Sequence, residues 1–325
     1  MSGALSPTVN YLRLSITDRC NLRCFYCTPA EGFVKLPAPE ILRYEEFLRL
    51  AGVAAAAGIR KIRVTGGEPL LRRDVVEFLA NLQRVPGLKE ICLTTNGVRL
   101  ADMAQDLYAT GLRHLNLSLD TLKQERYRQL TGSDNLLEVL AGLERARDLG
   151  FQPLKINCVA LKGINDDELL DFAGLAREHP FQVRFIEFMP TVPGEHWAKH
   201  FLPMTEVRRR LAPLGALEPV GSATTAGPAR ISRLPGFRGE LGFISPVSQH
   251  HCSSCNRLRL TASGGLRPCL FAETEIDLKG PLRRGESDDF LRQLFEQAMG
   301  LKDRGPRLKA PEFLPLCRPM VTIGG

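Results

Sequence analysis

The sequence YLRLSITDRCNLRCFYC at residues 11–27 joins an alternating segment to three closely spaced cysteines. Apolar and polar residues alternate from 11 to 16, which predicts a strand with one apolar and one polar face. The cysteines that follow, Cys20, Cys24 and Cys27, have the spacing C-x₃-C-x₂-C, and no other Cys or His occurs within the next 60 residues. A structural zinc site closes with four ligands. Three thiolates on a four-iron cluster instead leave one iron open, so this loop predicts an iron–sulfur site that takes a further ligand.

Outward from this loop, strand-like and helix-like segments alternate as far as about residue 214. The predicted strands are 11–16, 61–64, 90–93, 114–119, 154–161 and 182–189. The predicted helices are 44–57, 74–83, 101–110, 135–149, 166–178 and 205–211. The alternation predicts an α/β fold built on a parallel sheet. We expect an incomplete parallel (β/α)₆ TIM-like barrel, with a doubly wound open sheet as the alternative.

The composition changes near residue 215, where Gly, Ser, Pro and Arg become more frequent and short strand-like pieces replace the alternation. We therefore predict two domains, a partial barrel at 1–214 and a C-terminal α+β region at 215–325 that closes it. The second region contains a predicted helix at 288–299 and a second cysteine triplet, Cys252, Cys255 and Cys269.

The second triplet permits two interpretations. His250 and His251 precede it, so a Cys₃His zinc site is one of them. A second open-iron cluster is the other, because the N-terminal triplet also lacks a fourth ligand. Arg257 and Arg259 share one face of an extended segment between these cysteines and could bind phosphates bidentately, unless they lie on a solvated edge strand.

Along several of the predicted strands, every second residue is polar, so these residues share one face of the sheet. A sheet with one face toward solvent would explain this pattern. Helices cover the faces of a βα sheet, however, so we expect this polar face to be enclosed. A buried face rich in Arg and Lys is costly unless it meets an anion. We therefore predict an interior cavity for a charged substrate, joined by Arg184 from the last strand. The polar residues are Arg13, Ser15, Thr17, Lys61, Arg63, Thr65, Asn116, Ser118, Asp120, Lys155 and Asn157.

The sequence TGGEP at residues 65–69 follows the second predicted strand. Its glycines and proline fit a simple turn. They also fit a backbone that approaches a ligand closely, with Glu68 available for a polar group. Its position close behind the cysteine loop favours the second interpretation.

The formal net charge of +7 and the pI of about 9 suit an anionic partner. No run of five like charges occurs and aromatic residues make up 7%, which argues against a nucleic-acid platform. The longest apolar run, 51–59, is too short to cross a membrane, and 1–7 does not resemble a signal peptide. We expect a cytoplasmic protein without membrane or nucleic-acid partners. Cys92, Cys158 and Cys317 are interpreted as buried small hydrophobic residues.

Several segments together resemble a known family. The cysteine loop with residues 65–69 resembles the radical S-adenosylmethionine (SAM) superfamily. Within it, the chain resembles the GTP 3′,8-cyclases of molybdenum cofactor biosynthesis over essentially its whole length, including the terminal Gly-Gly. The segments that carry this resemblance are 14–24, 62–74, 93–97, 116–120, 184–189 and 255–261.

The resemblance implies two [4Fe–4S] clusters, one on each triplet, with SAM on the open iron of the first and the guanine of GTP on that of the second. One electron would cleave SAM to a 5′-deoxyadenosyl radical, which would take the 3′ hydrogen of GTP; the resulting C3′ radical would attack C8 of guanine. It implies SAM contacts from Tyr26, Gly67, Ser118 and Met189. The implied GTP contacts are Arg13, Arg63, Thr94, Lys155, Arg184, Arg257, Leu258 and Arg259.

The implied partners are GTP, SAM, a one-electron reductant and a downstream cyclic pyranopterin monophosphate synthase, with a homodimer left open. Two alternatives compete with the cyclase. One is another radical SAM enzyme with an auxiliary cluster, such as a peptide-modifying one; the other is a zinc-stabilised nucleic-acid binder. His250 and His251 do not fit the family pattern, and residues 191–201 receive no role.

Overall fold

A parallel sheet runs through the middle of the chain in a computed structural model that describes residues 9–29, 32–190, 196–221, 227–249, 252–272, 274–303 and 319–323. Within those residues twelve strands form one sheet, in the order β12-β11-β10-β1-β2-β3-β4-β5-β6-β9-β8-β7. Its first six strands along the chain are β1 (Tyr11–Ser15), β2 (Lys61–Thr65), β3 (Glu90–Thr95), β4 (His114–Ser118), β5 (Leu154–Ala160) and β6 (Gln182–Glu187). Neighbours among these six pair in parallel, which confirms the predicted α/β fold.

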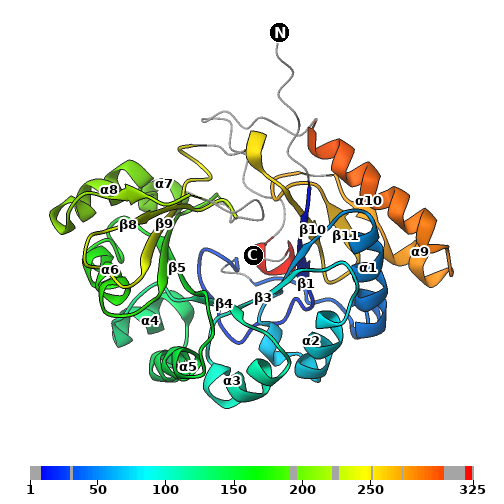
Figure 1. Cartoon of the computed structure of the whole chain (residues 1–325), viewed down its shortest axis with the longest axis horizontal. Coiled ribbons are helices and arrows are strands. Elements are labelled where there is room, and N and C mark those ends of the chain that lie inside the picture. The colour runs from blue at the N-terminus through cyan, green and yellow to red at the C-terminus, as the bar shows by residue number, and fades with distance from the viewer. Residues whose placement is uncertain are drawn as a thin grey trace, which may run out of the picture.

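Helices follow these strands along one side of the curved sheet, as Figure 1 shows. They are α1 (Tyr44–Ala56), α2 (Val75–Gln83), α3 (Leu100–Ala109), α4 (Gln124–Thr131), α5 (Leu136–Asp148), α6 (Leu169–Glu178), α7 (His196–His200) and α8 (Met204–Leu211). Short 3₁₀ turns occur at Ala38–Glu40, Pro69–Leu71, Ala212–Leu214 and Cys252–Ser254. The doubly wound alternative would place helices on both faces, which is not the arrangement in Figure 1.

The C-terminal region extends the sheet at both edges. Its strands are β7 (Glu218–Pro219), β8 (Arg230–Arg233), β9 (Glu240–Ile244), β10 (Arg257–Leu260), β11 (Gly265–Arg267) and β12 (Ile276–Asp277). Its helices are α9 (Lys279–Arg283), α10 (Asp288–Asp303) and α11 (Met320–Ile323). Strand β9 pairs in parallel with β6, and β10 pairs in parallel with β1. The described residues do not join β7 to β12, so strand pairing leaves the sheet open.

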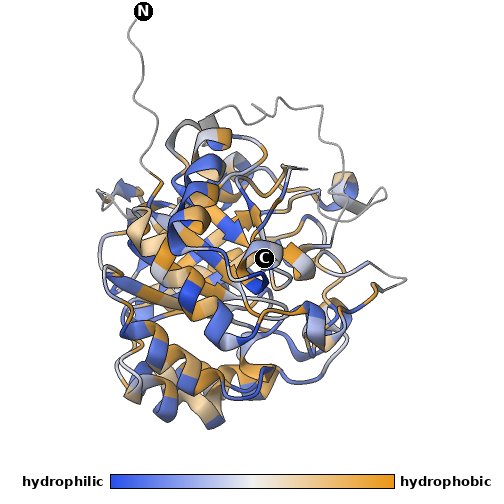
Figure 2. Cartoon of the chain, turned by 90° about the vertical axis from the view of Figure 1, so that its right-hand side faces the viewer, coloured by the Kyte–Doolittle hydropathy of each residue, from blue (hydrophilic) through white to orange (hydrophobic). Residues whose placement is uncertain are grey.

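The alternation of side chains builds the hydrophobic core on the helical side of the sheet. Leu12, Leu14, Ile62 and Val64 are each at most 1% exposed and pack in that core. The covering helices carry both hydrophilic and hydrophobic residues in Figure 2, as expected of amphipathic helices on a sheet. The polar parity of the same strands therefore points to the opposite, inner side.

The structure bears on the burial of the scattered cysteines and on the question of a membrane span. Cys92 and Cys158 are buried, at 0% and 1% exposure, as predicted, while Cys317 lies outside the described residues. No described helix has the length and apolar character that a membrane span requires.

A buried carboxylate connects three elements near the end of β6. The Glu187 side chain is 0% exposed and accepts hydrogen bonds from the backbone N–H groups of Met204 (2.8 Å), Val247 (3.0 Å) and Ser248 (2.9 Å). The hydroxyl of Ser248 donates to it as well. Glu187 thus links β6, the start of α8 and the loop after β9.

Replacing Glu187 with Ala should leave three buried backbone donors without an acceptor. Because each unsatisfied donor costs about 1–3 kcal/mol, we expect a loss of at least about 3 kcal/mol in the free energy of unfolding, measured by chemical denaturation. Glu187→Gln keeps one carbonyl acceptor and should lose less. The control Glu178→Ala, at an exposed position on α6, should stay within about 0.5 kcal/mol of the wild type. Equal effects of Glu187→Ala and Glu178→Ala would contradict this role.

Candidate functional site

A cavity of about 690 Å³ occupies the inner side of the sheet, and both cysteine triplets line it. Cys20, Cys24 and Cys27 come from the loop after β1. Cys252 and Cys255 precede β10, and Cys269 follows β11. The parallel pairing of β1 with β10 brings these distant segments to one chamber.

The predicted site residues lie together in this cavity with one exception. Besides the six cysteines, the lining contains Arg13, Tyr26, Arg63, Gly67, Thr94, Ser118, Lys155, Arg184, Met189, Arg257 and Arg259. The side chain of Leu258 is instead 0% exposed in the hydrophobic core and is not part of the lining. Successive residues of a strand point to opposite faces, so the predicted GTP contact of Leu258 is limited to its backbone.

The first triplet is a tight loop of half-buried cysteines. The N–H groups of Cys27 and Thr28 donate to the carbonyl oxygen of Cys24, at 2.9 and 3.0 Å. Burial raises the pKa of Cys24 well above its ordinary value, and the nearby Cys27 adds to this effect. Burial, with Cys20 nearby, raises the pKa of Cys27 to about 12. These thiols become thiolates only with a compensating positive charge, which an iron–sulfur cluster would supply.

The second triplet has a more cationic environment. Burial alone would raise the pKa of Cys255, but Arg257 and Lys302 hold it at about 6. Burial and the two neighbouring cysteines raise the pKa of Cys252. The thiolate of Cys255 is therefore available at neutral pH to bind a metal.

The spacing of the sulfur atoms bears on the kind of metal site that each triplet could form. Zinc–sulfur bonds of about 2.3 Å in a tetrahedron place two sulfurs about 3.8 Å apart. Among the described residues, neither triplet has all three sulfurs within 4.8 Å of one another. A single zinc ion would therefore require the sulfurs of either triplet to move closer together. His250 and His251 lie outside the described residues.

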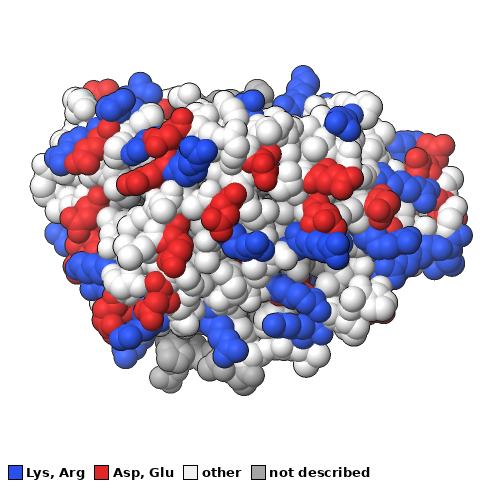
Figure 3. Space-filling model, turned by 90° about the horizontal axis from the view of Figure 1, so that it is seen from below, with Lys and Arg blue, Asp and Glu red and all other residues white. Residues whose placement is uncertain are grey.

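Basic side chains dominate the cavity. Within the described residues, eight Lys or Arg side chains and four Asp or Glu side chains line it. The outer face in Figure 3, by contrast, mixes both signs of charge. Burial, with Arg184 and Arg63 nearby, lowers the pKa of Lys155 to about 7. Burial also lowers the pKa values of Arg13 and Arg184 to about 10. A bound polyanion would offset the repulsion among these positively charged side chains.

The inner face also presents polar atoms without protein partners. In the described structure, Thr65 Oγ1, Asn116 Oδ1 and Asn157 Oδ1 are buried and make no hydrogen bond. All three residues line the cavity. Buried polar atoms normally have partners, so these atoms point to a polar ligand. Together with the basic side chains they agree with the predicted polar inner face, except that Ser15 and Thr17 are buried and do not line the cavity.

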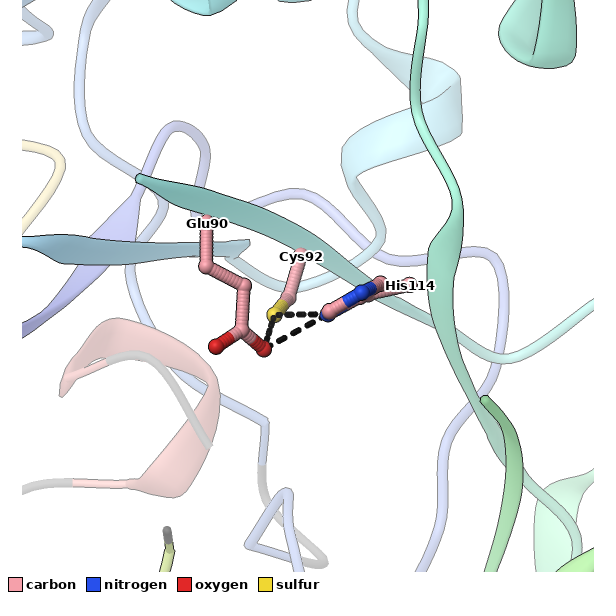
Figure 4. Close-up of side chains that lie close together, drawn as sticks. All are labelled: Glu90, Cys92 and His114. Carbon is pink, nitrogen blue, oxygen red and sulfur yellow. Dashed lines mark hydrogen bonds and ion pairs between the residues drawn. The ribbon is translucent and has the colours of Figure 1, made fainter. Parts of the chain in front are cut away.

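The amino-terminal halves of β2, β3 and β4 carry a set of side chains that we call the floor cluster: Lys61, Glu90, Cys92 and His114. Of these, Lys61 and Glu90 line the cavity. Figure 4 shows Glu90, Cys92 and His114 converging. Glu90 Oε1 lies 2.7 Å from Lys61 Nζ, 2.6 Å from His114 Nδ1 and 3.2 Å from Cys92 Sγ. Hydrogen bonds with Cys92 and Glu90 raise the pKa of His114 to about 9.

The floor cluster is an ion-pair network rather than a metal site. By ligand type and spacing, Glu90, Cys92 and His114 could hold a metal ion. The ammonium of Lys61, however, already occupies the same oxygen of Glu90, and the charge of Arg63 also acts on Cys92. Both positive charges oppose a bound cation.

The two glycines of residues 65–69 are required by contact with the cysteine loop. The N–H of Gly67 donates to Thr17 O and that of Glu68 to Arg19 O, both at 2.7 Å. A Cβ atom on Gly67 would lie 2.3 Å from Arg19 O. The side chain of Glu68 accepts hydrogen bonds from Leu70, Thr95 and Asn96 and so supports the next loop.

Two further elements approach the first triplet. The Tyr26 hydroxyl donates to Asp120, whose pKa is raised to about 6 by burial. The backbone of Val321, in α11, hydrogen-bonds to Cys27. The C-terminal helix therefore reaches the cavity, while Gly324 and Gly325 lie outside the described residues.

Residues 191–201 received no predicted role, and 191–195 lie outside the described residues. Trp197 packs with Phe25, Tyr26 and Phe188 beside the cysteine loop, and its indole N–H donates to Phe188 O at 2.8 Å. This contact gives Trp197 a packing role.

The alternation of the strands placed Lys61 and Asp120 on the predicted polar face, and both line the cavity. Other lining residues were not predicted, among them Glu90 and Lys302. Glu90 begins a strand whose alternation was too short to mark it. Lys302 comes from α10, and nothing in the sequence pattern links that helix to the cavity.

Family models cover most of the chain. Residues 14–176 match the model of the radical SAM superfamily. Residues 181–307 match the model named Molybdenum Cofactor Synthesis C.

Full-length relatives share nearly half of the residues. A GTP 3′,8-cyclase of Moorella thermoacetica is 48% identical over 325 residues, covering 100% of both chains. A GTP 3′,8-cyclase of Thermodesulfovibrio yellowstonii is 45% identical over 328 residues, again with full coverage of both.

Solved structures support the fold. Streptococcus suis SuiB bound to S-adenosylmethionine matches with a TM-score of 0.55 and 15% identity, over 89% of this chain and 68% of that one. Native anSMEcpe with bound AdoMet matches with a TM-score of 0.55 and 17% identity, over 81% and 75%. At these identities the similarity concerns the fold alone.

Replacing Gly67 with Ala should disrupt the junction between the glycine segment and the cysteine loop. The new Cβ meets backbone atoms of Arg19, which cannot rotate away, so we expect a loss of roughly 2 kcal/mol or more in the free energy of unfolding. Iron retention by the neighbouring triplet, followed by visible absorbance after anaerobic reconstitution, should also fall. The control Gly52→Ala, in α1 with no atom within 4 Å, should be neutral or stabilising by up to about 1 kcal/mol. Wild-type stability and iron content in Gly67→Ala would refute this explanation.

The raised pKa of His114 predicts a pH-dependent contribution to stability. The imidazolium is favoured in the folded state, so its contribution is complete below about pH 6.5 and is lost as the pH rises through about 9. The free energy of unfolding of the wild type minus that of His114→Gln should therefore be largest near pH 6 and smallest near pH 10. We expect roughly 1 kcal/mol after allowance for solvent screening. Repeating both measurements with Cys92→Ala separates the imidazole from the thiol. A difference that grows with pH would contradict the ion pair.

Proposed function

Since the chain belongs to the GTP 3′,8-cyclase family of the radical SAM superfamily, we propose that its cavity converts GTP to (8S)-3′,8-cyclo-7,8-dihydroguanosine 5′-triphosphate, in the first step of molybdenum cofactor biosynthesis. The observation that carries the proposal is the convergence of two cysteine triplets and a basic inner face on one chamber. A radical reaction on a nucleotide needs both parts within reach of each other.

The first triplet would hold a [4Fe–4S] cluster through Cys20, Cys24 and Cys27, with SAM bound to its open iron. When bound, the cluster and SAM, with one electron from a reductant, would supply the radical chemistry that removes the 3′ hydrogen of GTP. Tyr26, Gly67, Ser118 and Met189 would contact SAM. Asp120 holds the Tyr26 hydroxyl by a hydrogen bond and so orients that ring.

The second triplet would hold a second [4Fe–4S] cluster through Cys252, Cys255 and Cys269, with the guanine base at its open iron. The lowered pKa of Cys255 and the wide spacing of the sulfurs support this assignment. The zinc alternative requires closer sulfurs and a fourth protein ligand.

The basic inner face would bind the triphosphate and ribose of GTP. Lys61, held by Glu90, adds a cation at the floor. The pKa of Lys155, about 7 in the open cavity, should rise when a triphosphate lies beside it, since an opposite charge favours the ammonium. The proposed GTP contacts are Arg13, Arg63, Thr94, Lys155, Arg184, Arg257, Arg259 and the backbone of Leu258.

The finer architecture belongs to the same proposal. A partial (β/α)₆ barrel at 1–214 would be closed by the region 215–325, which adds a parallel strand to each edge of the first six. Enclosure by this region would keep water and other hydrogen donors away from the radical. A one-electron reductant, product transfer to a cyclic pyranopterin monophosphate synthase, a homodimer and a cytoplasmic location complete the proposal as predictions.

The competing functions account for fewer observations. A peptide-modifying radical SAM enzyme would share the fold but has no need for a chamber lined by eight basic side chains in the described structure. A zinc-stabilised nucleic-acid binder leaves the glycine segment at residues 65–69 and the enclosed basic chamber unexplained.

Anaerobic reconstitution with iron and sulfide, then incubation with SAM, reductant and GTP, tests the proposal. We expect about eight irons per chain, as two four-iron clusters, and GTP-dependent formation of 5′-deoxyadenosine together with the cyclised nucleotide. The matched control replaces GTP with ATP, which lacks the guanine base. Zinc in place of iron at the second triplet would refute the two-cluster assignment. 5′-Deoxyadenosine formed equally with ATP would refute the substrate.

A further inference from the structure

The side chain of Lys302 reaches the second cysteine triplet from the last turn of α10. Its Nζ donates to the carbonyl oxygen of Arg257 at 2.9 Å and to that of Pro268 at 3.2 Å, and it lies 3.2 Å from Cys255 Sγ. An ammonium group has three donor protons. These three contacts therefore use its full donor capacity.

The partners of Lys302 belong to two separate parts of the cysteine site. Arg257 follows Cys255 by two residues at the start of β10, whereas Pro268 immediately precedes Cys269. One ammonium thus ties together the two segments that carry the triplet. Because one ammonium group contacts both segments, it limits the distance between them. It therefore also limits the distance between the cysteine sulfurs that they carry.

The helix that carries Lys302 is anchored independently of the cysteines. Leu291, Phe295 and Ala298 of α10 are each 0% exposed in the core. Arg49 of α1 pairs with Asp288 at the first turn, at 2.8 Å. Figure 1 shows α10 lying along α1 at the edge of the sheet. The ammonium is therefore delivered from a fixed support.

We propose that Lys302 is a positioning residue for the second iron–sulfur cluster, tying its two ligand segments together and raising its reduction potential through the contact with Cys255. The inference rests on the proposed function, which assigns a cluster to this triplet. Reduction adds negative charge to the cluster and its sulfurs. A cationic hydrogen-bond donor at a ligand sulfur stabilises that charge, because hydrogen bonds and local charge set cluster potentials.

Lys302 differs in this respect from the arginines beside it. Its three protons already have acceptors on the protein, so it has no donor left for a phosphate. Its removal should therefore act on the cluster rather than on a direct contact with a phosphate.

The experiment compares the wild type with Lys302→Met and Lys302→Arg after anaerobic reconstitution of the full chain. A redox titration followed by electron paramagnetic resonance gives the midpoint of each cluster. In Lys302→Met the equilibrium constant for one-electron reduction of one cluster should fall at least about tenfold, or 59 mV, while the other cluster is unchanged. Lys302→Arg should restore the midpoint. The control Arg292→Met removes one charge from the exposed face of the same helix and should match the wild type.

Each other outcome has a defined meaning. About four irons in the wild type would refute the second cluster itself, and with it the proposed function of this triplet. With about eight irons in the wild type, unchanged midpoints in Lys302→Met would overturn the role of Lys302 alone. Loss of four irons from Lys302→Met but not from Lys302→Arg would support the role of Lys302 in linking the two ligand segments. Loss from both variants would overturn that role. If Lys302→Met does not fold, Lys302→Gln, which keeps a donor without the charge, undergoes the same titration.

Discussion

Repulsion among buried cations is the constraint on which the rest of this structure depends. Eight Lys or Arg side chains from β1, β2, β5, β6, β10 and α10 line one chamber in the described structure, against four carboxylates. Burial with like charges nearby lowers the pKa of Lys155 to about 7 and those of Arg13 and Arg184 to about 10. Such a face is stable only if the scaffold around it is strong and a polyanion enters it. The apolar parity of the same strands, packed under α1 to α6, supplies the scaffold.

The pairing of β1 with β10 gives the chamber its chemistry. In the register of this pairing, Tyr11 lies beside Arg257 and Arg13 lies beside Arg259. The two arginines of β10 therefore have one aromatic and one basic neighbour on β1. The same pairing brings the second cysteine triplet to the chamber that the first triplet already lines. The two cysteine triplets and the basic strand residues are therefore linked through a single parallel contact. The anchoring of α10 on α1 then adds Lys302 to this arrangement.

Local patterns predicted the elements whose two faces differ in polarity. The alternation at 11–16 became β1, and the other five predicted strands agree with the observed ones to within a few residues. Helix α4 was missed because Gln124–Thr131 is mostly polar and buries only Tyr127, Leu130 and Thr131. Strands β9 and β10 were not identified as parallel partners because they are short and their pairing is set by contacts far along the chain. Leu258 shows the limit of motif transfer, since its side chain faces the core while its neighbours face the cavity.

The sequence by itself determined the cysteine spacing, the polar parity of the strands and the glycines that permit close backbone contact, because each depends on residues a few positions apart. Only the tertiary structure decided which distant groups meet. It placed Lys61 and His114 around one carboxylate oxygen of Glu90 in the floor cluster. It also brought α11 to Cys27 and Lys302 to Cys255. Those contacts join residues separated by up to roughly 300 positions along the chain. They follow from strand order and helix packing, which no local pattern of residues encodes.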